Sequence, residues 1–179
     1  MSAACVGLSL PLSLSDIKPD NIGIGADGSV KLLDFGLAVC VHQRSSLDEA
    51  YEMTGFTGSL RYMSPEVAQR RPYNERVDQY SFALVVWQMA TGQTPFKGYT
   101  KDQLLQEVVA EGRRPPLDSK QISPDLAKLL SRCWHTSPSR RPAFSEVVTE
   151  MARMLDKECG AESRPLAAQV GSSGASAWF

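Results

Sequence analysis

Residues 75–91 constrain the fold more than any other part of the sequence, because they are apolar on almost every face of a helix. The apolar residues recur with no polar stripe that would face water: Val77, Tyr80, Phe82, Ala83, Leu84, Val85, Val86, Trp87 and Met89. A helix of this kind is buried on all sides, and Gly92 is the residue type that commonly follows a helix end. We therefore predict a central helix over 75–91 that the rest of the domain surrounds.

Most of the other periodic segments are also helical. The spacing of apolar residues predicts four further helices, over 65–69, 101–111, 124–133 and 144–157. Ser64 and Ser123 stand where a side chain commonly caps a helix start. Residues 21–24 and 30–33 have the character of strands, and the turn between them predicts a hairpin. The fold class is therefore mainly α within the α+β family, with about five helices and one short hairpin.

Length, charge and cysteine usage exclude several classes of protein. A chain of 179 residues fits one domain, and a formal net charge of −1 gives no global attraction to nucleic acid or to anionic lipid. Cys5, Cys40, Cys133 and Cys159 form no C-x-x-C pair, which favours reduced thiols. No stretch approaches the ~20 apolar residues of a membrane span. We expect a cytoplasmic or nuclear protein that binds neither nucleic acid nor membranes; the sequence gives no oligomeric state.

The polar residues with the clearest chemistry lie next to the predicted hairpin. Asp16, Lys18 and Asn21 precede or begin the first strand, and Asp34 follows the second. A hairpin brings Asn21 and Asp34 near one another, and amide and carboxylate oxygens suit a hard cation. Phosphoryl transfer needs such a cation, a carboxylate that orients the attacking hydroxyl, and a positive charge that meets the phosphoryl group. Each of these motifs alone is more often part of an ordinary solvated loop. The assignment of a function therefore depends on the order of several motifs along the chain.

Five motifs in a fixed order resemble those of one family. They are 16–21 (D-I-K-P-D-N), 34–36 (D-F-G), 57–66 (T-G-S-L-R-Y-M-S-P-E), 77–82 (V-D-Q-Y-S-F) and 133–142 (C-W-H-T-S-P-S-R-R-P). Over about residues 16–155 the chain resembles the C-terminal lobe of a eukaryotic-type Ser/Thr protein kinase. The lysine in the D-x-K-x-x-N motif resembles the residue that Ser/Thr kinases have at this position. Residues 21–24, 87–88 and 94–96 resemble the tyrosine-kinase-like group of these enzymes.

The resemblance implies the roles of the reacting residues. Asp16 would be the catalytic base, and Lys18 would be a catalytic residue that also contacts the phosphates of the cofactor. Asn21 and Asp34 would bind the nucleotide through its metal ion. The implied cofactors are ATP and Mg²⁺.

Other matching residues would support the site: Phe35, Gly36, Ser59, Glu66, Asp78 and Arg141. The resemblance implies that the Ser59 hydroxyl bonds Asp16 and Lys18. It also implies that Asp78 binds backbone amides of the catalytic loop and that Arg141 pairs with Glu66. The presumed activation segment between Gly36 and Ser64 contains candidate phosphorylation sites at Ser45, Ser46 and Thr54. The alternative for that segment is a plain flexible loop.

The resemblance also implies parts that the sequence does not contain. Nothing before Asp16 resembles a Gly-rich phosphate loop, a strand lysine or an adenine-binding hinge. We therefore expect a non-homologous segment over 1–15, a partial kinase domain over 16–158 and a disordered tail over 159–179. A missing neighbour helix would leave apolar surface of helix 75–91 exposed.

Two hypotheses for function follow. The first is an ATP-dependent protein Ser/Thr kinase, present here as a truncated domain that is not competent alone. The second is a catalytically silent fragment or pseudokinase that binds protein substrates or regulatory proteins through 52–66 and 97–116.

Overall fold

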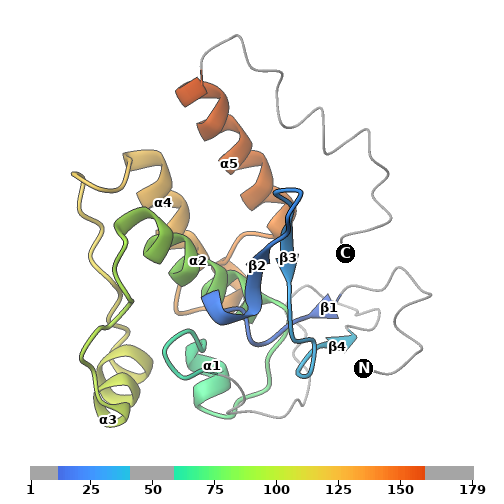
Figure 1. Cartoon of the computed structure of the whole chain (residues 1–179). Coiled ribbons are helices and arrows are strands. Elements are labelled where there is room, and N and C mark those ends of the chain that lie inside the picture. The colour runs from blue at the N-terminus through green and yellow to red at the C-terminus, as the bar shows by residue number, and fades with distance from the viewer. Residues whose placement is uncertain (1–11, 41–58, 160–179) are drawn as a thin grey trace.

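A computed structural model describes residues 12–40 and 59–159, and places the helices around one long central helix (Figure 1). Strands β1 to β4 span Leu12–Ser13, Ile22–Ile24, Val30–Leu32 and Val39–Cys40, and the 3₁₀ turn η2, Pro19–Asn21, precedes β2. The helices are α1 Pro65–Ala68, α2 Arg76–Thr91, α3 Lys101–Gln103, the π-helix η3 Leu104–Ala110, α4 Pro124–Cys133, the 3₁₀ turn η4 Pro138–Arg140 and α5 Phe144–Cys159. The predicted fold class, mainly α with a short hairpin, is confirmed.

The central helix is α2, as its apolar faces predict. Tyr80, Ala83 and Leu84 have no exposed surface, and α2 packs against α4, which packs in turn against α5. Gly92 ends the helix with a φ of 66°, a left-handed conformation that glycine adopts without steric penalty. Its N–H bonds the Gln88 carbonyl at 2.8 Å. The helix therefore begins one residue later than predicted and ends where predicted.

Much of the apolar surface that we expected to find exposed on α2 is covered. On this helix the exposed large apolar side chain is Met89, while most of the others point into the core. Elsewhere in the described residues, exposed large apolar side chains lie in and after the hairpin and on α5: Ile24, Val30, Leu32, Leu33, Val39, Val148 and Leu155. None of the helices described here is long and apolar enough to cross a bilayer. The hairpin therefore presents more of these exposed apolar side chains than α2 does.

Two antiparallel strand pairs position the polar loops. β2 pairs with β3 as predicted, and the turn between them passes Gly28 at a φ of 80°. β1 pairs with β4, with Ser13 opposite Val39, and this pair was not predicted. Because β1 ends just before Asp16 and β4 begins just after the loop of Asp34, the second pair holds the two polar loops side by side (Figure 1).

The helix ends agree only in part with the sequence signals. The Ser123 hydroxyl caps α4 by accepting a backbone N–H of the first turn at 3.3 Å, as predicted. Ser64 precedes α1 but makes no capping bond, and its buried hydroxyl has no hydrogen-bond partner among the described residues. The helix predicted over 101–111 begins as α3 and continues as η3, where Glu111 N–H bonds the Gln106 carbonyl at 3.0 Å. Residues 160–179, which include most of the predicted tail, lie outside the described residues.

Candidate active site

A carboxylate of α2 fixes the loop that carries Asp16. Asp78 is 3% exposed and accepts hydrogen bonds from the backbone N–H groups of Leu14 and Ser15, both at 2.8 Å. Burial raises the pKa of Asp78 to about 6, and the two backbone bonds oppose this rise. Ser15 has a φ of 60°, a conformation that a non-glycine residue keeps only where its surroundings enforce it. The structure therefore contains the contact that the resemblance implied for Asp78.

Asp16 lies at the centre of a set of polar contacts. Its carboxylate accepts hydrogen bonds from Lys18 Nζ at 2.6 Å, Asn21 Nδ2 at 3.1 Å and the Ser59 backbone N–H at 3.2 Å. The bond to Asp16 is the main cause that raises the pKa of Lys18, so the ammonium stays charged at neutral pH. Ser59 thus contacts Asp16 through its backbone N–H, and the contact that the resemblance implied for its hydroxyl stays a prediction.

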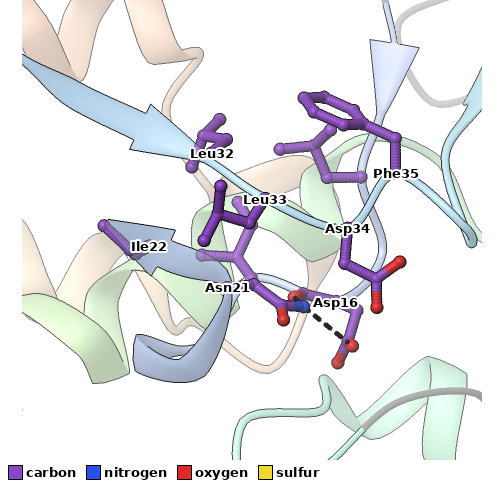
Figure 2. Close-up of a pocket in the computed structure, with 9 residues that line it drawn as sticks. Asp16, Asn21, Ile22, Leu32, Leu33, Asp34 and Phe35 are labelled. Carbon is purple, nitrogen blue, oxygen red and sulfur yellow. Dashed lines mark hydrogen bonds between the residues drawn. The ribbon is translucent and has the colours of Figure 1, made fainter. Parts of the chain in front are cut away.

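Asn21 and Asp34 line the same small pocket, with their side chains turned toward Asp16 (Figure 2). Apolar residues complete the pocket: Leu14, Ile17, Ile22, Leu32, Leu33 and Phe35. Its volume of about 10 Å³ is on the order of one water molecule or one ion. Asp34 has a φ of 57° and directs its side chain from the end of β3. The hairpin thus brings these two residues together, as the sequence predicts.

The oxygen atoms of this pocket suit a magnesium ion. Asn21 Nδ2 donates to the Asp16 backbone carbonyl at 2.9 Å, so the amide oxygen of Asn21 points away from that bond. One Asp34 oxygen accepts the Gly36 N–H at 3.0 Å, and no donor among the described residues bonds the other. Within 12–40 and 59–159, no group of three or more His, Cys, Asp and Glu side chains gathers. An ion held by Asn21 and Asp34 would therefore take its other ligands from water and phosphate, as Mg²⁺ commonly does.

A buried ion pair joins α1 to the segment before α5. Both Arg141 Nη atoms donate to the Glu66 carboxylate, at 2.5 and 2.9 Å, and the Arg141 side chain is fully buried. Arg141 also donates to the backbone carbonyls of His135 and Arg76, at 2.9 and 2.8 Å, and lies over the Tyr80 ring. The structure therefore contains the pair that the resemblance implied, and surrounds it with further hydrogen bonds.

Described residues of the two predicted protein-binding segments, 52–66 and 97–116, line a groove beside the site, and sequence reasoning missed the arginine that supports it. Ser59, Leu60, Arg61, Lys101 and Leu104 line an open groove of about 410 Å³. Arg61 Nη1 donates to the backbone carbonyls of Pro95 and Phe96, the latter at 2.6 Å. Arg61 belongs to the motif at 57–66, but the sequence alone does not indicate which groups its side chain bonds.

The structure does not place every candidate residue. The candidate phosphorylation sites Ser45, Ser46 and Thr54 lie outside the described residues. Phe35 lines the pocket and Gly36 bonds Asp34, so both residues of the D-F-G motif that follow Asp34 take part in the site.

Comparison with known sequences identifies the family. Residues 12–151 match the Protein kinase domain family. The chain belongs to the protein kinase family. The match includes β1, which lies before the first of the five motifs.

Curated relatives agree with this assignment. Serine/threonine/tyrosine-protein kinase HT1 of Arabidopsis thaliana is 36% identical over 84% of this chain and 36% of the relative. Serine/threonine-protein kinase STY17 of the same plant is 37% identical over 83% of this chain and 25% of the relative. Receptor-interacting serine/threonine-protein kinase 4 of Mus musculus is 34% identical over 84% of this chain and 20% of the relative. The chain thus spans about a third or less of these relatives, which fit the predicted tyrosine-kinase-like group.

Proposed function

We propose that this chain carries the phosphoryl-transfer site of an ATP-dependent protein serine/threonine kinase. The observation that carries the proposal is the convergence of Asp16, Asn21 and Asp34 on one pocket, with Lys18 bonded to Asp16. Protein kinases generally use ATP and Mg²⁺, and the oxygen donors of the pocket suit that ion. The lysine of the D-x-K-x-x-N motif favours a Ser or Thr hydroxyl as acceptor, as do the names of STY17 and of receptor-interacting kinase 4, while the name of HT1 adds tyrosine.

Each side chain has a separate task in this proposal. Mg·ATP, when bound, supplies a γ-phosphoryl group whose bond to the β–γ bridging oxygen breaks. Asp16 accepts a hydrogen bond from the substrate hydroxyl, orients its oxygen toward the phosphorus and takes the proton as the new O–P bond forms. Lys18, kept charged by Asp16, holds its ammonium beside the phosphoryl oxygens. Asn21 and Asp34 would hold the metal ion.

The groove lined by Ser59, Leu60, Arg61, Lys101 and Leu104 is the proposed docking surface for the protein substrate. It begins at the residue whose N–H lies 3.2 Å from the Asp16 carboxylate. Leu60 and Leu104 give it an apolar lining. A peptide chain in this groove would therefore present a hydroxyl to Asp16 while it buries a neighbouring side chain.

A second candidate is a catalytically silent module that binds proteins through the same groove. Two observations favour it. The pocket at Asp34 has room for only about one ion, and apolar side chains of the neighbouring hairpin are exposed, with Ile24 80% exposed. The described residues thus form little surface that would enclose the base and sugar of a nucleotide. Both proposals keep the predicted division of the chain at 1–15, 16–158 and 159–179, and both keep the predicted cytoplasmic or nuclear location.

Nucleotide binding and phosphate transfer separate the two candidates. Titration calorimetry with Mg·ATP and a radiolabelled kinase assay should be run on this chain, on Asp34→Ala and on Asp27→Ala. Asp27 is an exposed acid in the turn of the same hairpin and lies outside the pocket. Binding or transfer that Asp34→Ala abolishes and Asp27→Ala preserves would support the kinase. Equal, blank results for all three proteins would reject it for this chain and favour the silent module.

A further inference from the structure

Two buried serine hydroxyls lie beside the loop that carries Asp16. Ser13 has no exposed surface and Ser15 is 9% exposed, and their Oγ atoms lie 3.3 Å apart. The pairing of β1 with β4 fixes Ser13 opposite Val39. Each hydroxyl has one proton to donate, so one serine donates to the other. The second serine needs a different acceptor, because a buried donor without a partner is costly.

That acceptor is the carboxylate of Asp78. The same carboxylate accepts the backbone N–H groups of Leu14 and Ser15, both at 2.8 Å. Burial raises the pKa of Asp78 to about 6, and a hydrogen bond from the Ser13 side chain opposes this rise, as the two backbone bonds do. The direction of the hydroxyl chain follows: Ser15 Oγ donates to Ser13 Oγ, and Ser13 Oγ donates to Asp78.

Protonation of Asp78 would reverse this chain of hydroxyls. The protonated carboxyl would donate to Ser13, and its bonds to the backbone N–H groups would lose the charge that strengthens them. Ser15 has a φ of 60°, which a residue with a Cβ keeps only where its surroundings hold it. The bond from its N–H to Asp78 is one of the contacts that hold it. The position of Asp16, the next residue, therefore depends on the charge of Asp78.

The charged residues nearest to Asp78 on α2 do not stabilise that charge. Glu75 lies one turn earlier, and its negative charge raises the pKa of Asp78 further. The guanidinium of Arg76 donates instead to the backbone carbonyl of Arg141, at 2.9 Å. The groups that face Asp78 from β1 and the loop after it are the uncharged hydroxyl and N–H groups described above. Hydrogen bonds therefore support the ionised carboxyl, and Ser13 supplies one of them from a side chain.

We propose that Ser13 is a positioning residue, which keeps the Asp78 carboxyl charged and so holds the loop that carries Asp16 in place at neutral pH. The inference rests on the proposed function for the catalytic role of Asp16. Ser13 does not itself contact the reacting atoms. It acts through Asp78, and Asp78 acts through the backbone of the loop. Without the Ser13 hydroxyl, Asp78 should take up its proton nearer to neutral pH, and the loop should lose its charged acceptor there.

NMR titration of the labelled chain from pH 5 to pH 8 tests this proposal. The ¹³C signal of the Asp78 carboxyl gives the midpoint of its protonation, and the amide signals of Leu14 and Ser15 report on the bonds that it accepts. The wild-type midpoint should lie near 6. Ser13→Ala should raise it by about one pH unit, since a hydrogen bond to a charged acceptor is worth roughly that much. Ser15→Ala should raise it by less, because Ser13 still donates to the carboxylate.

A matched variant separates this effect from a general loss of packing. Ser81→Ala removes another buried hydroxyl of α2, which donates to the backbone carbonyls of Tyr62 and Val77 at 2.8 and 3.2 Å, and it should leave the Asp78 midpoint unchanged. Ser13→Thr keeps a hydroxyl and should restore the wild-type midpoint. If Ser13→Ala does not fold, Ser13→Cys takes its place, and its weakly donating thiol should raise the midpoint by a smaller amount. An unchanged midpoint without the Ser13 hydroxyl, or an equal shift in Ser81→Ala, would overturn the proposal.

The same spectra report on the position of Asp16. The Ser59 N–H bonds the Asp16 carboxylate at 3.2 Å, so the Ser59 amide signal responds when that carboxylate moves. At pH 7 the signal should shift in Ser13→Ala and stay in place in Ser81→Ala. A Ser59 signal that does not move, although the Asp78 midpoint rises, would overturn the positioning role of Ser13.

These measurements contain no nucleotide, so they can fail separately from the proposed function. Mg·ATP titration of the wild type and of Asp34→Ala tests the nucleotide site. If no nucleotide binds, a midpoint and a Ser59 signal that depend on Ser13 still support its role in holding the loop. Nucleotide binding that depends on Asp34, together with an unchanged midpoint in Ser13→Ala, would reject the role of Ser13 and leave the proposed function intact.

Discussion

The substitution Glu66→Gln should destabilise this domain by about 3–5 kcal/mol, the usual loss when a buried charge is left without its partner. Glu66 accepts two hydrogen bonds from Arg141, at 2.5 and 2.9 Å, and the Arg141 side chain has no exposed surface. Glutamine has nearly the same shape but turns an NH₂ group toward one of the two guanidinium nitrogens. One donor therefore loses its acceptor, and the positive charge stays buried and uncompensated.

This loss is large compared with the stability of a typical domain. Whole domains are stable by roughly 5–15 kcal/mol, so the substitution removes a substantial part of the total. The backbone carbonyls of His135 and Arg76 still accept from Arg141, but they carry no compensating charge. The double variant Glu66→Gln with Arg141→Met removes both charges. Its loss of unfolding free energy should be smaller than the sum of the two single losses by about 1–3 kcal/mol.

Urea unfolding gives the measurement. Trp87 and Trp134 are buried, at 3% and 4% exposure, so their fluorescence reports on the loss of the core. The matched control is Asp125→Asn, which removes the carboxylate of an exposed pair with Lys157 at 2.5 Å. Because water screens an exposed pair, this variant should leave the midpoint nearly unchanged. A loss below about 1 kcal/mol for Glu66→Gln, with an unchanged urea slope, would refute the reasoning.

Three further predictions concern buried polar groups. Because burial raises the pKa of Asp78 to about 6 from 3.8, its carboxyl contributes stability at low pH that is lost as the pH rises through about 6. Wild type should therefore gain about 1 kcal/mol relative to Asp78→Asn between pH 7 and pH 5, in paired urea curves; a gap that stays constant contradicts this. Cys133 is buried, and its pKa is raised to about 12, so iodoacetamide should alkylate it in urea but not in the native state, as mass spectrometry of its peptide would show. Ser64→Ala should leave the melting temperature unchanged or raise it, since the hydroxyl is buried without a partner; a clear drop would mean that the hydroxyl does cap α1.

The elements predicted correctly are those with a local signal. Helix α2 has apolar residues on nearly all faces and a glycine at its end, and the hairpin has a turn between two apolar runs. The pairing of β1 with β4 was missed because each strand has two residues, too few to show a period. The change from α3 to the π-helix η3 was missed because seven residues are too few to distinguish the repeat of a π-helix from that of an α-helix.

The candidate site divides in the same way. Asp16, Lys18 and Asn21 are close in sequence, and the hairpin brings Asp34 to them, so their proximity follows from local structure. Asp78 lies 63 residues after Ser15, and its contact was expected only because the chain resembles a kinase. The bond from the Ser59 backbone and the Arg61 contact with the loop after α2 depend on tertiary packing, for which the sequence carries no local signal.

The central claim is that Asn21 and Asp34 hold a divalent ion beside Asp16, and paramagnetic broadening tests it most directly. Mn²⁺ in place of Mg²⁺, added with ATP to the labelled chain, broadens NMR signals of nuclei close to the ion. We predict that the Asn21 side-chain amide and the backbone amides of Asp34 and Gly36 broaden first, while Val148 on α5 stays sharp, and that Asp34→Ala removes the effect. Broadening that begins elsewhere, or that persists unchanged in Asp34→Ala, would contradict the claim.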